Sequence, residues 1–206
     1  MLPKGFTYLK DARFILSLDY FTSSNFLGRP VAGYQAKVCI LTELAAQALI
    51  NVQDELDTLQ SGYRLKIFDT YRPANAVADF VQWAKEADEK MKAMFYPKVE
   101  KTELFKKGYI AERSSHSRGS TVDLTIAVSH DPQMTPVELD MGTMFDYFDE
   151  KAHTNHPNLS DTAKKNRQFL KQIMEKHGFE NYPLEWWHFT LKNEPFPETY
   201  FDFPVR

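Results

Sequence analysis

An aspartate stands in the middle of the most strand-like segment of this chain. The residues from Thr121 to Ile126 are rich in β-branched side chains, which favours a buried strand. Asp123 lies in this segment between Val122 and Leu124. A carboxylate is costly to bury unless a partner compensates its charge. A fold that buries this strand must therefore bring a metal ion or hydrogen-bond donors to Asp123.

A histidine precedes this aspartate by seven residues. The small, polar run from Ser114 to Ser120 predicts a turn, in which Gly119 allows the chain to bend tightly. The imidazole of His116 in this turn could reach a metal ion that also contacts Asp123, because His and Asp are ordinary zinc ligands. Hydrogen bonds between Asp123 and the backbone are the alternative interpretation.

A second candidate pair lies near the C-terminal end, where Glu185 and His188 enclose two tryptophans. On an ideal strand, side chains three residues apart point to opposite faces. A shared site therefore requires a bend at Glu185, and Pro183 makes such a bend plausible. The alternative is that the aromatic residues of this run are simply part of the core.

Together these segments supply two histidines, one aspartate and one further carboxylate. Three protein ligands leave a fourth zinc position open for water, which is the arrangement of catalytic sites. Glu185 could then take the proton from that water as it attacks a carbonyl. Arg72, in a Tyr-Arg-Pro turn, could stabilise the oxyanion. The prediction depends on the joint occurrence of these residues, because each short motif alone is weak.

The periodicity predicts an α+β fold, in which one domain spans residues 1–206 and a small, mainly antiparallel sheet is flanked by helices. Long loops are expected over 95–108 and 129–160. The predicted helices are 36–60, 77–90 and 160–177, and the predicted strands are 63–69, 109–111, 121–126 and 186–191.

Composition limits the classes of partner. The formal net charge of −3 over 206 residues predicts no nucleic-acid partner. No apolar run approaches the roughly 18 residues needed to span a bilayer, so we expect no membrane span. The single cysteine, Cys39, excludes an intrachain disulfide, and its apolar surroundings predict a buried structural thiol within the first helix. We expect a cytoplasmic protein, or a periplasmic one if a leader has been removed.

Around these residues the chain resembles the VanX-type zinc D-alanyl-D-alanine dipeptidases, within the wider D-Ala-D-Ala peptidase group. The family signatures are Ser-x-His-x-x-Gly-x-Ala-x-Asp and Glu-x-x-His, which correspond here to residues 114–123 and 185–188. Thr121 departs from the first signature, which has Ala there, and its hydroxyl is expected to perturb the surroundings of Asp123 or to hydrogen-bond with it. Further blocks resemble the dipeptidase subgroup at residues 5–9, 25–34, 69–73, 145–150 and 200–205.

The resemblance implies zinc-dependent hydrolysis of D-alanyl-D-alanine, or a close D,D-dipeptide, to free amino acids. It implies one Zn²⁺ per chain and a small dipeptide as the partner. The residues that it implies are the zinc ligands His116, Asp123 and His188, the general base Glu185, the transition-state stabiliser Arg72, the partner of the substrate amino group Asp146, and the further substrate contacts Ser115 and Tyr20.

Other functions remain as alternatives at this stage. The same residues suit a D,D-carboxypeptidase or an L,D-endopeptidase that acts on peptidoglycan peptides, or a zinc-binding module without turnover. The resemblance is compatible with roles in antibiotic resistance, cell-wall recycling or scavenging of D-alanine, and with a homo-oligomer. His and Asp also accept divalent ions other than zinc.

Overall fold

The larger of the two β-sheets among the described residues forms the centre of the structure. The computed structural model describes residues 1–59, 62–129 and 135–206. The larger sheet has the strand order β2-β4-β5-β8-β7, and β6 pairs with β5 outside this path. Its strands are β2 (Ile15–Leu16), β4 (Tyr63–Asp69), β5 (Thr121–Val128), β6 (Val137–Glu138), β7 (Phe179–Asn181) and β8 (His188–Leu191). Strands β2 and β4 are parallel and the other pairs are antiparallel, so the predicted α+β class is confirmed.

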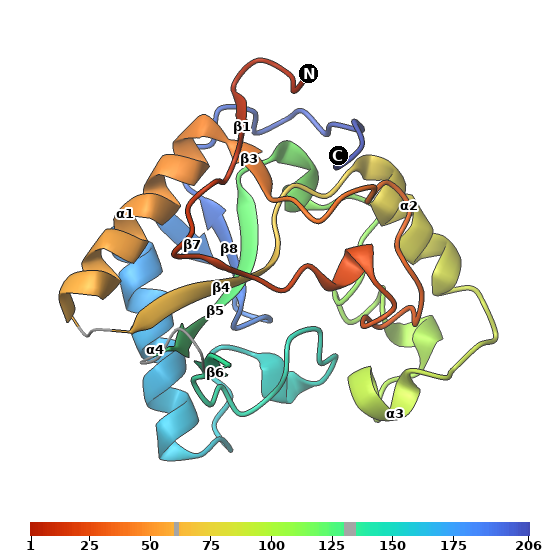
Figure 1. The fold of residues 1–206 in the computed structure, drawn as a ribbon. Coiled ribbons are helices and arrows are strands. Elements are labelled where there is room, and N and C mark those ends of the chain that lie inside the picture. Colours follow the sequence, from red (N-terminus) through yellow and green to blue (C-terminus); the bar gives the residue numbers. More distant parts are fainter. Residues whose placement is uncertain (60–61, 130–134) are drawn as a thin grey trace.

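Helices lie on both sides of this sheet in the view of Figure 1, with α1 and α4 on one side and α2 and α3 on the other. The α-helices of the described residues are α1 (Glu43–Leu59), α2 (Ala74–Trp83), α3 (Lys92–Phe95) and α4 (Asp161–Lys176). A second, two-stranded antiparallel sheet joins β1 (Phe6–Tyr8) to β3 (Ile40–Thr42).

The C-terminal helix begins and packs as its sequence predicts. The hydroxyl of Ser160 accepts a hydrogen bond from the backbone N–H of Ala163 at 3.1 Å, which caps the first turn of α4. Its apolar stripe joins the core through Leu170, Ile173 and Met174. The loss of water contact by such apolar side chains is the main favourable contribution to folding.

Strand β5 lies between β4 and β8, and its register places the acidic and basic groups of the site side by side. Asp123 pairs with Asp69 of β4 and with His188 of β8. The register of β4 shifts between Ile67 and Asp69, as in a β-bulge. One row across the sheet therefore holds two carboxylates and an imidazole.

Several predicted boundaries are wrong, because tertiary pairing overrides local periodicity. The first helix begins at Glu43 rather than at residue 36, since the preceding segment, Ile40–Thr42, pairs with β1. Cys39 is thus buried next to a strand and not within a helix.

Other differences concern the later elements. Helix α2 begins at Ala74 and ends at Trp83, whereas the prediction ran from 77 to 90. Residues 109–111 form no strand, and the last strand starts at His188 instead of 186. The predicted loop at 130–134 lies outside the described residues. Within the described residues, no helix has the length and the apolar character that crossing a bilayer requires.

We expect the thiol of Cys39 to be unreactive in the folded protein. The residue is 2% exposed, and burial raises the pKa of the thiol to about 12, so the reactive thiolate is scarce at neutral pH. Ellman's reagent should therefore label almost no thiol in native buffer and one thiol per chain in guanidinium. Rapid stoichiometric labelling of the native protein would contradict this burial.

Candidate active site

A short 3₁₀ turn, Ser115–Arg118, presents His116 to the central sheet. The hydroxyl of Ser114 accepts from the backbone N–H of His116 at 3.3 Å, and Gly119 ends the turn with φ of +83°. A side chain at Gly119 would be strained at this φ and would clash with the ring of Phe6. The local sequence therefore fixes where the chain leaves the turn and enters β5.

Three predicted ligands converge at one point. Nε2 of His116 lies 3.1 Å from Oδ2 of Asp123, and Nδ1 of His188 lies 3.1 Å from Oδ1. The two imidazole nitrogens face each other at 3.3 Å. One donor atom from each residue lies within 4.8 Å of the others, a spacing that suits a shared metal ion.

The hydrogen bonding of Asp123 supports this assignment. Among the described residues, its buried Oδ1 has no hydrogen-bond partner of suitable geometry. A buried carboxylate oxygen without such a partner is costly, and a cation would compensate it. The two imidazoles and the carboxylate are also the N and O donors that zinc accepts, so the residues present fit a zinc ion.

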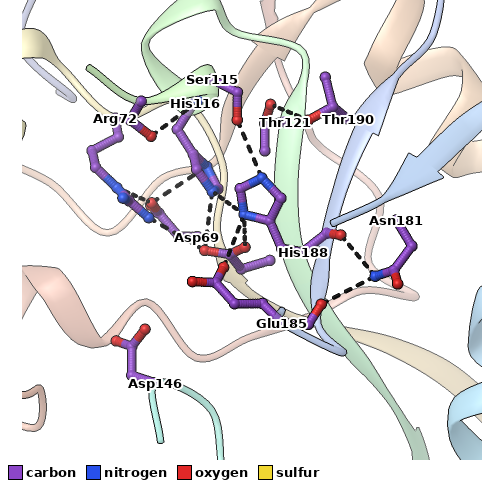
Figure 2. Close-up of polar contacts among 12 residues, drawn as sticks. Asp69, Arg72, Ser115, His116, Thr121, Asp146, Asn181, Glu185, His188 and Thr190 are labelled. Atoms are coloured by element: carbon purple, nitrogen blue, oxygen red, sulfur yellow. Dashed lines mark hydrogen bonds and ion pairs between the residues drawn. The ribbon is translucent and has the colours of Figure 1, made fainter. Parts of the chain in front are cut away.

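Neighbouring polar groups orient both imidazoles. Nδ1–H of His116 donates to the carbonyl oxygen of Thr70 at 2.6 Å, which leaves Nε2 free to accept. The hydroxyl of Ser115 lies 3.2 Å from Nε2 of His188, while Nδ1 of the same ring faces Asp123. The carbonyl of Thr70 thus sets the His116 tautomer that points a lone pair at the centre of the cluster, and the Ser115 hydroxyl is placed to accept the proton of Nε2 when Nδ1 of His188 binds a metal (Figure 2).

Glu185 reaches the same cluster because the chain bends between β7 and β8. Its backbone N–H donates to the carbonyl of Tyr182 at 3.0 Å, and the N–H of His188 donates back to the carbonyl of Glu185 at 3.3 Å. The carboxylate oxygen Oε2 then lies 3.3 Å from Nδ1 of His188. Burial, and after it the charge of Asp123, raise the pKa of Glu185 to about 7, although His188 and Arg72 lower it. The bend expected beside Pro183 is confirmed.

Arg72 is held rigidly beside the cluster. Its Nε donates to Oδ2 of Asp69 at 2.9 Å, and its Nη2 lies 3.3 Å from Oδ2 of Asp123. The guanidinium carbon is 5.1 Å from the ring centres of both Tyr20 and Phe80. Figure 2 shows Arg72 with Asp69 next to His116.

Asp69 is a site residue that sequence reasoning missed, except as part of a resembling block. It is 2% exposed and accepts a hydrogen bond from the hydroxyl of Tyr34 at 2.7 Å. The signal was a second aspartate at the end of an apolar strand, the same pattern as Asp123. Its charge fixes the orientation of Arg72.

The predicted substrate contacts line one cavity with the cluster. A cavity of about 580 Å³ is bordered by Tyr20, Ser115, Asp146, Glu185 and other residues. The hydroxyl of Tyr20 donates to Oδ2 of Asp146 at 2.8 Å. Burial, followed by the charge of Asp123, raises the pKa of Asp146 well above its ordinary value. All the predicted site residues thus border this cavity or the cluster within it, and their individual roles stay predictions.

The hydroxyl of Thr121 contacts a residue of β8 and not Asp123. Its hydroxyl is 2.9 Å from the hydroxyl of Thr190, the residue opposite it on β8. Figure 2 shows this hydrogen bond between the two threonine hydroxyls. The departure from the signature is therefore accommodated by β8 and not by a hydrogen bond to Asp123.

The chain is similar to known dipeptidases along nearly its whole length. A family model described as D-ala-D-ala dipeptidase matches residues 9–206. A D-alanyl-D-alanine dipeptidase of Enterococcus faecium is 41% identical over 205 residues, which cover 98% of both chains. One of Enterococcus faecalis is 40% identical over 207 residues, covering 99% of this chain and 100% of that protein. One of Streptomyces coelicolor is 41% identical over 188 residues, or 90% of each.

We expect replacement of a predicted ligand to weaken metal binding strongly. His116→Ala and Asp123→Ala each remove one donor atom of the cluster, so zinc affinity should fall beyond the roughly 10- to 100-fold seen when groups behind ligands are lost. Competition with a chromogenic chelator measures this affinity. His156→Ala, a change in the 153–158 loop, is the matched control and should keep wild-type affinity. Unchanged affinity in both ligand variants would exclude this cluster as the metal site.

Proposed function

The chain belongs to the D-Ala-D-Ala dipeptidase family of peptidases, and from this premise we propose that it hydrolyses D-alanyl-D-alanine, or a close D,D-dipeptide, in a zinc-dependent reaction. One observation carries the proposal. The carboxylate of Glu185, whose side chain is half-buried, lies 3.3 Å from an imidazole nitrogen of the His116, Asp123 and His188 cluster. Three ligands with an adjacent base are what metal-assisted hydrolysis requires.

The proposed role of the cluster is to hold one zinc ion. Zinc bound by these three residues supplies acidification of water and polarisation of a carbonyl. His116 would bind through Nε2 and His188 through Nδ1, because their other nitrogens face Thr70 and Ser115. The carboxylate of Asp123 would complete the set and neutralise part of the cation's charge.

Glu185 is proposed as general base and then general acid. Its Oε2 accepts a proton from the attacking water and later delivers it to the leaving amine nitrogen. Burial raises the pKa of Glu185, which favours its holding the proton between the two transfers. A carboxylate with an ordinary pKa would be a weaker acid catalyst in the second half of the reaction.

Arg72 is proposed to stabilise the oxyanion that develops on the scissile carbonyl. The ion pair with Asp69 and the aromatic rings of Tyr20 and Phe80 hold the guanidinium before substrate arrives. A fixed charge in a site of low water content needs no reorganisation during the reaction.

Asp146 is proposed to bind the ammonium group of the substrate. It is 5% exposed, and the hydroxyl of Tyr20 holds one of its oxygens. A substrate cation compensates the buried carboxylate, whereas an acylated amine leaves it without a charged partner. This demand for a free amino group favours a dipeptidase over the carboxypeptidase and endopeptidase alternatives, whose substrates continue beyond that nitrogen.

We expect Glu185→Gln to abolish turnover and to retain zinc. The amide keeps the shape of the side chain but cannot take a proton, so kcat should fall by roughly 10²- to 10⁴-fold. Release of D-alanine and metal content are measured on the same preparation. Glu198→Gln, at an exposed position, serves as the control and should behave as wild type. Near-normal kcat in the Glu185→Gln protein would remove Glu185 from the base role.

We expect Asp146→Asn to relax the demand for a free amino group. Asp146 has φ of +58°, a region that Asn tolerates, so the backbone should be preserved. The ratio of kcat/KM for D-Ala-D-Ala to that for its N-acetyl derivative should fall by about tenfold or more, since the charge pair worth several kcal/mol is lost. Asp161→Asn, at an exposed position, is the control. An unchanged ratio would refute the role of Asp146.

A further inference from the structure

A buried asparagine spans two carbonyl groups of the site's hairpin loop. Asn181 ends β7, and the loop from 182 to 187 leads to β8. Its Nδ2 donates to the carbonyl of Glu185 at 3.1 Å and to the carbonyl of His188 at 3.0 Å. Figure 2 shows both bonds from the one carboxamide. The two carbonyls belong to the proposed base and to a proposed zinc ligand.

We propose that Asn181 is a positioning residue, which aims the carboxylate of Glu185 by fixing its backbone relative to that of His188. This inference rests on the proposed function of Glu185. It adds a residue that touches neither substrate nor metal and acts through the loop backbone. Asn181 is 8% exposed, so bulk water does not readily replace its hydrogen bonds.

The hydroxyl of Thr154 contacts the oxygen of the Asn181 carboxamide and helps to orient it. Oγ1 of Thr154 donates to Oδ1 of Asn181 at 2.6 Å, and Nδ2 faces two carbonyl oxygens that can only accept. The flipped amide would point its oxygen at the carbonyl oxygens. Thr154 is 3% exposed and is itself anchored, since its N–H donates to the carbonyl of Pro183 at 2.9 Å.

The carboxamide matters more for Glu185 than for His188. His188 belongs to β8, where it pairs with Asp123, and its carbonyl also accepts from the N–H of Tyr182 at 3.0 Å. Glu185 lies in the irregular loop, and the other bond to its carbonyl, from the N–H of His188, is longer at 3.3 Å. Loss of the carboxamide should therefore release the base while the ligand stays in place.

If Asn181 had a purely structural role, its replacement would have different effects. If Asn181 only stabilised the hairpin, its loss would lower the melting temperature and leave the catalytic constants of the folded enzyme unchanged. A positioning role lowers kcat, because proton transfer depends on the aim of Glu185, and leaves KM nearly constant. The ratio of the two kinetic effects separates these roles.

The test compares Asn181→Ala with Ile173→Val in the zinc-loaded full chain. Ile173 is a buried residue of α4, so its shortening lowers stability without touching the loop. For Asn181→Ala we expect kcat on D-Ala-D-Ala to fall by about tenfold or more, KM to change by less than about threefold, and zinc affinity by chelator competition to remain near wild type. For Ile173→Val we expect both kinetic constants to be unchanged.

A second pair of variants tests the same inference with a smaller change. Thr154→Val removes the hydroxyl that orients the carboxamide, whereas Thr154→Ser keeps it. We expect Thr154→Val to lower kcat in the same sense as Asn181→Ala, and Thr154→Ser to keep kcat near the wild-type value. This pair answers the question even if Asn181→Ala does not fold.

Three outcomes would overturn the inference. The first is an unchanged kcat in both Asn181→Ala and Thr154→Val. The second is an equal loss of kcat in Thr154→Val and Thr154→Ser, and the third is a loss of zinc affinity as large as the loss of kcat.

The Glu185→Gln protein is assayed in parallel, because it separates this inference from the proposed function. If this protein retains activity, the proposed function of Glu185 fails. If it is inactive while Asn181→Ala and Thr154→Val are unaffected, only the role of Asn181 is rejected.

Discussion

The compensation of one buried carboxylate, that of Asp123, governs the arrangement of the rest of the site. Asp123 is 2% exposed in the middle of the central strand, where an unpaired negative charge would be strongly unfavourable. His116 of the 3₁₀ turn lies next to Oδ2 of Asp123, and His188 of β8 lies next to Oδ1. Arg72, just after the end of β4, also lies next to Oδ2. Because these groups come from distant segments, the charge of Asp123 is compensated only in the folded chain.

Within this cavity, surroundings give similar side chains different roles. The charges of His116 and His188 outweigh burial and lower the pKa of Asp123, which suits a metal ligand. Burial dominates at Glu185 and Asp146 and raises the pKa of each, which suits proton transfer at one and the reception of a substrate cation at the other. The fold separates these acidic groups along one cavity, as the proposed division between proton transfer and substrate binding requires.

Sequence signals predicted an element correctly where the interactions that form it act between residues close in the chain. The cap of Ser160 and the β-branched run of β5 predicted α4 and the central strand, because capping and strand propensity act within a few residues. The first helix was predicted too early, since pairing with β1 draws Ile40–Thr42 into a strand. Family signatures supplied the residues of the candidate metal site, but no local rule indicated that Asp69 would hold Arg72 or that Asn181 would span the hairpin loop.

By itself, the sequence determined which chemical groups are available and that Asp123 must be buried beside a cation or donors, since both follow from composition and the strand pattern. The tertiary structure alone decided how those groups meet. The register of β5 with β4 and β8 sets Asp69, Asp123 and His188 in one row, and the bend after Tyr182 turns Glu185 toward them. Register and loop geometry depend on contacts between residues far apart in the chain, so local periodicity cannot specify them.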